Sequence, residues 1–173
     1  VRGGALLAKK ASFFGKVERF EFDVAIPAFH GLYGEDGNIQ GLFELANIPY
    51  IGMRTMASSV LMDKGATKYL LKANDIPALP FATLRRPESG YLIPEAELAE
   101  TLKDIGFPCV IKPSHLGSSI GVAKVDSVEE AKACLPAIFE FDDAAIAEPF
   151  VANMIEYNFA VGKIGGGAVR TSA

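Results

Sequence analysis

Apolar and polar positions in the first third of the chain follow the order strand, loop, helix, strand. The continuous apolar run at residues 22–29 is typical of a strand buried in a parallel sheet. A glycine-rich polar loop, HGLYGEDGN, follows, and IQGLFELANI then has apolar residues at helical spacing, with Asp36 or Asn38 available as N-cap. IPYIG predicts a short second strand. This βαβ-type order indicates the end of a doubly wound domain.

The pattern after about residue 55 is mixed. Apolar positions at helical spacing predict one helix over residues 55–76, closed by Asn74 and Asp75. Further helices are predicted at 94–106, between Pro94 and Gly106, and at 127–141, where Ser127 and Glu130 have capping-box spacing. Strands are predicted at 76–84, 144–151 and 154–164, together with a hairpin at 108–125. We expect an antiparallel sheet with helices packed on one face.

The hairpin, PCVIKPSHLGSSIGVAKV, carries the first candidate chemistry. Backbone N–H groups in a glycine- and serine-rich turn suit anions, and a lysine at the end of the preceding strand adds a charge that phosphate accepts well. The residues of this candidate lid are Lys112, Gly117, Ser118, Ser119 and Gly121. It is not a Walker A loop, because no helix follows the glycines. On these residues alone, a mobile surface hairpin with a solvated lysine is an equal alternative.

Two carboxylates and one further lysine are candidates for nucleotide contacts. Glu148 ends an apolar strand and Glu156 begins the next one. A carboxylate at a strand end can accept a hydrogen bond from the amino edge of a purine, and a second one can accept from ribose hydroxyls. Taken singly, Glu148, Glu156 and Lys64 are better interpreted as solvated side chains, because Glu and Lys are mostly exposed in proteins.

Composition excludes several classes of function. Half of the 173 residues are apolar and 22% are charged, as in globular proteins, and the net charge of −4 argues against a general nucleic-acid binder or a polybasic membrane-surface protein. No apolar run approaches the roughly 20 residues of a membrane span, and no secretory signal pattern opens the chain. Cys109 and Cys134 lack metal-ligand spacing and fit core positions in a reducing compartment, so we expect a cytoplasmic protein.

Four segments in order carry a resemblance to a known family: HGLYGEDGNIQGLFELANIPYIG, MASSVLMDKGATKYLLKANDIP, PCVIKPSHLGSSIGVAKV and AEPFVANMIEYNFAV. Together they resemble the D-alanine–D-alanine ligases of the ATP-grasp superfamily, from about residue 22 to residue 161. The resemblance implies an α/β and α+β chain with the ATP-grasp fold. It places the end of a Rossmann-like N-terminal domain at 1–58, the central ATP-binding subdomain at 59–163, and the start of the C-terminal subdomain at 164–173.

The resemblance also implies roles for individual residues. Lys64 and Lys112 match phosphate-contacting lysines, and Ser118 matches a lid serine that orders the site around the first D-alanine. Glu148 matches the acceptor of the adenine amino group, beside the backbone of Pro149 and Val151. Glu156 matches the ribose-binding acid, and His30 and Glu35 match positions beside the first D-alanine.

The activity that the resemblance implies is ATP-dependent joining of two D-alanines through an acyl phosphate, for peptidoglycan precursors. The cofactors implied are ATP and Mg²⁺, with the metal ligands expected beyond residue 173. The longer parent protein is expected to be a homodimer. The sequence begins without Met and stops where a glycine-rich segment predicts another strand, so we interpret it as an internal, catalytically inactive piece of a longer protein.

Two residues depart from the family pattern, and alternative functions stay open. Pro149 stands where this family often has a lysine, and Arg54 stands where small residues are more usual. A ligase for D-lactate or D-serine as second substrate, and a nucleotide-binding module without catalysis, remain alternatives. His115 has no matching role and is expected to point to solvent. Phe20 and Phe29 are expected to pack in a core or between lobes.

Overall fold

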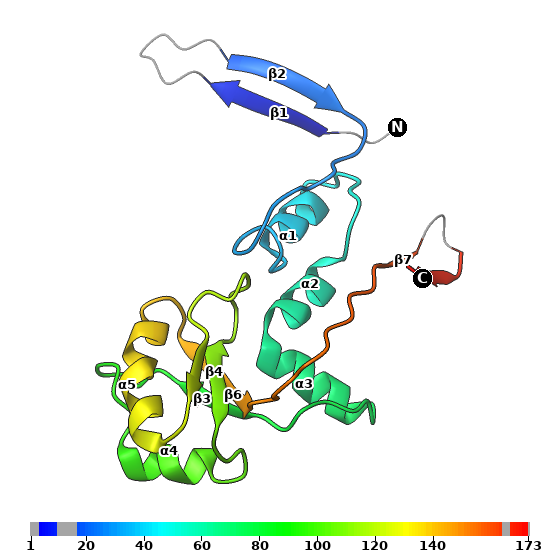
Figure 1. Ribbon diagram of the computed structural model, residues 1–173. Coiled ribbons are helices and arrows are strands. Elements are labelled where there is room, and N and C mark those ends of the chain that lie inside the picture. The colour runs from blue at the N-terminus through cyan, green and yellow to red at the C-terminus, as the bar shows by residue number, and fades with distance from the viewer. Residues whose placement is uncertain (1–3, 10–16, 164–166, 173) are drawn as a thin grey trace.

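A four-stranded antiparallel sheet forms the centre of the larger lobe. The computed structural model describes residues 4–9, 17–163 and 167–172. The strand order is β3 (Ala82–Arg85), β6 (Ala144–Pro149), β4 (Cys109–Pro113), β5 (Ala123–Val125), and every neighbouring pair is antiparallel. Helices α4 (Glu95–Leu102) and α5 (Val128–Phe139) cover one face of this sheet, as the sequence predicts (Figure 1).

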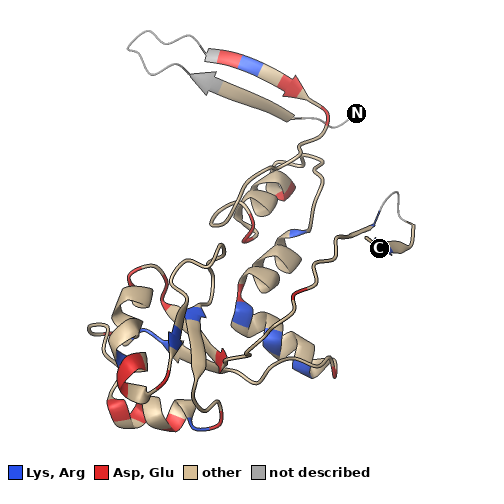
Figure 2. Ribbon diagram, in the orientation of Figure 1, with Lys and Arg blue, Asp and Glu red and all other residues tan. Residues whose placement is uncertain are grey.

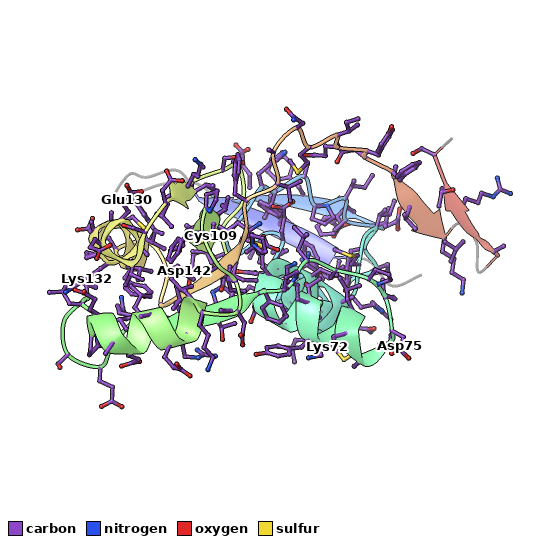
Figure 3. All side chains as sticks on the ribbon, turned by 60° about the horizontal axis from the view of Figure 1, so that its bottom comes forward. Lys72, Asp75, Cys109, Glu130, Lys132 and Asp142 are labelled. Atoms are coloured by element: carbon purple, nitrogen blue, oxygen red, sulfur yellow. The ribbon has the colours of Figure 1, made fainter. Side chains whose placement is uncertain are left out.

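Side chains from that covered face and the two helices make the hydrophobic core. Leu98, Leu102, Leu135 and Phe139 are almost fully buried against the sheet, and complete burial of such a side chain contributes about 1.5–3 kcal/mol. Cys109 lies in the interior of this lobe (Figure 3), where burial, with a small contribution from Cys134, raises the pKa of its thiol to about 11. The expectation of a core cysteine is therefore confirmed.

The segment predicted as one long helix is two helices, α2 (Thr55–Met62) and α3 (Lys64–Ala73). Asp63 interrupts the helix with an extended backbone, and its carboxylate accepts a hydrogen bond from the Ala66 N–H at 3.0 Å, capping α3. The single-helix prediction was wrong because an aspartate that can cap a helix favours a new start over continuation. Asn74 ends α3 as predicted. Helix α3 lies on the face of the sheet opposite α4 and α5 (Figure 1).

The N-terminal part differs most from its prediction. Strands β1 (Gly4–Lys9) and β2 (Val17–Phe22) form an antiparallel hairpin, and β2 ends where the buried strand was expected to begin. In residues 22–29 one isolated parallel bridge joins Ala25 to Tyr50, so the predicted parallel pairing survives only there. Phe20 and Phe29 are 51% and 55% exposed, so neither packs in a core among the described residues.

Helix ends agree only in part with the predicted caps. Helix α1 (Asn38–Leu45) occurs as predicted, but its N-cap is Gly37 and not Asp36 or Asn38. Pro94 is the N-cap of α4 and not its first residue. Ser127 caps α5 by accepting from the Glu130 N–H at 3.2 Å, whereas the Glu130 carboxylate accepts from the Asp126 N–H and not from Ser127.

The last described residues form a small hairpin, β7 (Val161–Lys163) and β8 (Val169–Thr171). Residues 151–160 are exposed and form an extended trace without a helix or strand (Figure 1), so the strand predicted at 154–164 was too long. The boundaries expected at residues 58 and 163 stay predictions. Among the described residues, no helix is both long enough and apolar enough to span a membrane.

Candidate functional site

Glu148 lies between two lysines on the face of the sheet that carries α3. Its side chain is only 9% exposed, and its two carboxylate oxygens form ion pairs with Lys68 of α3 and Lys112 of β4. Figure 2 shows basic residues along α3 and an acidic segment on β6 beside it. Burial by itself would raise the pKa of Glu148, but the hydrogen bonds from Lys112 and Lys68 outweigh it and lower that pKa. Glu148 is therefore an ionised acceptor at neutral pH.

Lys64 joins α3 to the base of the glycine–serine loop. Its ammonium donates to the carbonyl oxygens of Pro113 at 3.0 Å, Ser114 at 3.3 Å and Leu116, and its backbone N–H donates to the Ser114 carbonyl at 3.1 Å. Burial, followed by the nearby charge of Lys112, lowers the pKa of Lys64. Lys64 thus holds a partly desolvated positive charge at the start of the loop.

The loop between β4 and β5 has the geometry of a strained turn. Ser118 and Ser119 have φ values of 52° and 57°, in the left-handed region that non-glycine residues rarely adopt. Gly121 has φ 69°, and a Cβ atom at this position would lie 2.9 Å from Cγ of Pro113. Glycine is therefore required at 121 for both its backbone angle and its close approach to the preceding strand.

Two adjoining cavities connect these residues. A cavity of about 360 Å³ lies under the loop, and its lining includes Lys64, Lys112, Gly117, Ser118 and Ser119. A second cavity of about 200 Å³ is lined by Lys64, Lys112 and Glu148, together with Leu61, Thr67, Lys68 and Leu71. The structure therefore brings together the lysines, the lid and the carboxylate that the sequence singles out.

The remaining expected nucleotide contacts lie at the edge of this site. Pro149 ends β6, and Val151 is exposed just beyond it. Glu156 is exposed in the extended segment, where its carboxylate accepts a hydrogen bond from the Asn158 side chain at 3.1 Å. Glu156 lines neither of the two cavities.

The loop that contains His30 and Glu35 is docked on α2, the helix that leads into α3. The Glu35 carboxylate accepts from the Gly31 N–H at 2.5 Å, and Ser59 of α2 donates to the Asp36 carbonyl at 2.7 Å. His30 is exposed at the start of the loop. These contacts hold the loop on the element that precedes Lys64, but neither His30 nor Glu35 lines the two cavities.

His115 does not simply point to solvent, as the sequence led us to expect. Its backbone N–H donates to Asp142 at 2.7 Å, its Nδ1 lies 2.8 Å from the other oxygen of Asp142, and its Nε2 lies 3.4 Å from Asp63. Burial alone would lower the pKa of His115, but Asp142 and Asp63 outweigh it and raise that pKa. The sequence prediction was wrong because both partners are distant along the chain.

Magnesium does not fit the described part of the site. Mg²⁺ prefers carboxylate and other oxygen ligands, whereas the two cavities contain a single carboxylate, Glu148, whose oxygens both bind lysines. Asp143 approaches His115 and Asp142 closely enough for a shared ion, but Asp142 already accepts three hydrogen bonds there. The residues described here therefore supply no magnesium site in the two cavities.

Lys68 is the site residue that the sequence analysis missed. It contacts Glu148 directly and lines the smaller cavity. The available signal was its spacing: Lys68 lies four residues after Lys64, on the same face of a helix. That spacing does not show which strand packs against this face of the helix.

Comparisons with known proteins agree with this fold. The D-ala D-ala ligase C-terminus family matches residues 70–172, and the D-ala D-ala ligase N-terminus family matches residues 4–53. The chain is 44% identical over 133 residues to the D-alanine–D-alanine ligase of Corynebacterium aurimucosum, covering 76% of this chain and 35% of that protein. It is 38% identical over 135 residues to the ligase of Bacillus velezensis, covering 78% and 38% respectively.

Two solved ligase structures have the same fold. The D-alanine–D-alanine ligase of Helicobacter pylori matches with a TM-score of 0.76 and 33% identity, over 96% of this chain and 47% of that one. The Coxiella burnetii ligase gives a TM-score of 0.74 and 30% identity, over 98% and 47%. The fold is thus part of an ATP-grasp fold. The chain belongs to the D-alanine–D-alanine ligase family and spans little more than a third of the length of these curated relatives.

Proposed function

We propose that this chain provides the nucleotide-binding part of an ATP-dependent ligase that joins two D-alanines. The product is D-alanyl-D-alanine, made through an acyl phosphate for peptidoglycan precursors. The observation that carries the proposal is the ionised Glu148 beside Lys112 and Lys64, next to a cavity under the glycine–serine loop. Family membership supplies the reaction class.

In this proposal, the two ends of ATP are recognised by different groups. Lys64 and Lys112 bind the phosphates, assisted by the lid residues Gly117, Ser118, Ser119 and Gly121. Glu148 accepts a hydrogen bond from the adenine amino group, and the backbone of Pro149 and Val151 lies beside the base. Glu156 binds the ribose.

The chemistry needs positioning and charge neutralisation more than a protein nucleophile. A carboxylate is a poor electrophile, so phosphoryl transfer from ATP activates the first D-alanine, and the amine of the second then displaces phosphate. Lysines that neutralise phosphate charge and a lid that excludes water favour both steps. His30, Glu35 and Ser118 are proposed to orient the first D-alanine.

Calorimetric titration with ATP tests the proposal directly. Wild type, Lys112→Ala and Glu148→Ala are compared with Lys132→Ala. Lys132 lies on α5 (Figure 3), where its side chain forms an exposed ion pair with Glu95 of α4. We expect both site variants to weaken ATP binding at least tenfold, because each removes a charge-assisted contact. Lys132→Ala should bind as wild type does. A folded wild-type chain that binds no ATP contradicts the proposal.

Several finer properties belong to the same proposal. We propose ATP and D-alanine as the small-molecule partners, without nucleic-acid or membrane partners, a homodimeric parent protein and a cytoplasmic location. Mg²⁺ ligands beyond residue 173, the boundaries at 58 and 163, and inactivity of this stretch alone stay predictions.

A further inference from the structure

Lys68 is held more firmly at Glu148 than Lys112 is. Its ammonium pairs with one oxygen of Glu148, donates to the Leu79 carbonyl at 3.0 Å, and lies 5.7 Å from the centre of the Phe81 ring. Its side chain is 14% exposed, against 28% for Lys112. Phe81 is itself fixed by an edge-on contact with Tyr69 of α3, with ring centres 4.9 Å apart.

Lys68 and Lys112 also differ in the cavities that they line. Lys112 lines both the cavity beside Glu148 and the larger cavity under the lid, whereas Lys68 lines only the former of these two. A ligand with phosphates under the lid would therefore compete with Glu148 for Lys112. Such a ligand would leave the contact between Lys68 and Glu148 in place.

A carboxylate recognises adenine only while it is ionised and points toward the amino group of the base. The adenine amino group donates a hydrogen bond, whereas a 6-oxo purine presents an acceptor oxygen at the same place, which a carboxylate repels. A buried carboxylate without a cation nearby protonates more readily, and its protonated form can donate to the oxo group. A cation that stays beside Glu148 would therefore favour adenine over a 6-oxo purine.

We propose that Lys68 is a positioning residue for adenine selectivity, which fixes the Glu148 carboxylate in its ionised form while Lys112 turns to the phosphates. The proposal rests on the proposed nucleotide-binding function and adds a specificity determinant to it. Lys68 contacts Glu148 and need not touch the nucleotide.

The test compares ATP with inosine triphosphate, which carries the same phosphates on a 6-oxo purine. Dissociation constants are measured by calorimetry for wild type, Lys68→Met, Lys68→Arg and the control Lys72→Met. Lys72 is the next lysine along α3, exposed near the end of the helix beside Asp75 (Figure 3). Circular dichroism confirms that each variant is folded.

We expect Lys68→Met to lower the preference for ATP over inosine triphosphate roughly tenfold, the size of a contact to a charged group. Lys68→Arg should restore most of the preference, because it restores the positive charge, and Lys72→Met should retain it. A general weakening of the fold would affect both nucleotides alike and leave the ratio unchanged.

Other outcomes separate this inference from the function on which it rests. If wild type prefers ATP and Lys68→Met keeps the same ratio, the role of Lys68 is overturned and nucleotide binding stands. If Lys68→Met weakens the binding of both nucleotides by the same factor, Lys68 supports the fold or phosphate binding, and the inference is again overturned. If folded wild type binds neither nucleotide, the proposed function fails and the inference fails with it.

Discussion

His115 and Asp142 are joined through two separate contacts, one from the backbone and one from the ring. The His115 N–H donates to Oδ2 of Asp142 at 2.7 Å, and Nδ1 lies 2.8 Å from Oδ1. Because His115 begins the lid and Asp142 precedes β6, the pair fixes the base of the lid to the sheet. Nε2 of the same ring approaches Asp63, the cap of α3.

This arrangement predicts that stability falls as the pH rises through the range in which the folded protein loses the His115 proton. The ring's own burial opposes protonation, but Asp142 and Asp63 raise the pKa of His115 overall. A raised folded-state pKa contributes stability that is complete below the unfolded pKa and is lost as pH rises through the folded value. With the ring partly exposed, we expect wild type to lose about 0.5–1 kcal/mol of unfolding free energy between pH 6 and pH 8.5.

Urea unfolding at the two pH values measures this difference. His115→Gln should remove most of the pH dependence, because glutamine does not titrate. His30→Gln is the matched control, since His30 is exposed on another loop, and it should leave the difference intact. Equal pH dependence in wild type and His115→Gln would show that the pair does not carry it.

Glu148→Gln should destabilise the fold at neutral pH. The substitution keeps the size of the side chain but leaves Lys68 and Lys112 without their shared negative charge in a largely buried place. Removing one partner of such a network typically costs about 3–5 kcal/mol, and the remaining amide oxygen reduces this to an expected 1–3 kcal/mol. Chemical unfolding at pH 7 measures the loss.

Unfolding at acid pH tests the same prediction a second time. Although burial favours the neutral form, the lysines lower the pKa of Glu148, so its contribution is present above the unfolded pKa and is lost as pH falls through the folded value. The stability gap between wild type and Glu148→Gln should therefore narrow in acid. Glu100→Gln, an exposed partner of Lys103, should change stability by less than about 0.5 kcal/mol.

The elements that the sequence predicted well are those specified by local chemistry. The hairpin at 108–125, the helices around Leu98 and Leu135, and the close of α3 at Asn74 each combine one periodic pattern with a turn or cap signal. The single helix over 55–76 failed at Asp63, where a capping side chain changed the local outcome. The apolar run at 22–29 failed for another reason. Such a pattern shows that a segment favours burial, but long-range partners decide whether it is buried.

The residues of the candidate site also differ in how far they could be predicted from local sequence. Lys112 and the loop glycines could be proposed from sequence as a candidate lid, because the lysine and the turn occur in one short segment. The contacts of Glu148 with Lys68, and of His115 with Asp142, join segments far apart in the chain. No spacing rule connects such residues, so their roles required the fold.

The glycines of the lid are expected to differ sharply in their tolerance of substitution. Gly121→Ala places a methyl group 2.9 Å from Cγ of Pro113 at a φ of 69°, so either the turn or strand β4 must shift. We expect a loss of about 1–2 kcal/mol in unfolding free energy, measured by urea unfolding. Gly117→Ala is the control, because an added Cβ there meets nothing within 4 Å. Equal stabilities of the two variants would contradict the steric argument.

Lys64→Met is expected to separate lid anchoring from adenine recognition. Lys64 supplies donors to the carbonyl oxygens of Pro113, Ser114 and Leu116 and lines both cavities, but it has no hydrogen bond to Glu148 in the structure. Its loss should weaken binding of inorganic tripolyphosphate about tenfold or more, since a partly desolvated cation is lost. The preference for ATP over inosine triphosphate should stay near the wild-type value, because Lys68 and Glu148 remain paired. Calorimetry with the three ligands measures both quantities, and a Lys64→Met chain that loses the preference but keeps tripolyphosphate affinity would reverse the assigned roles.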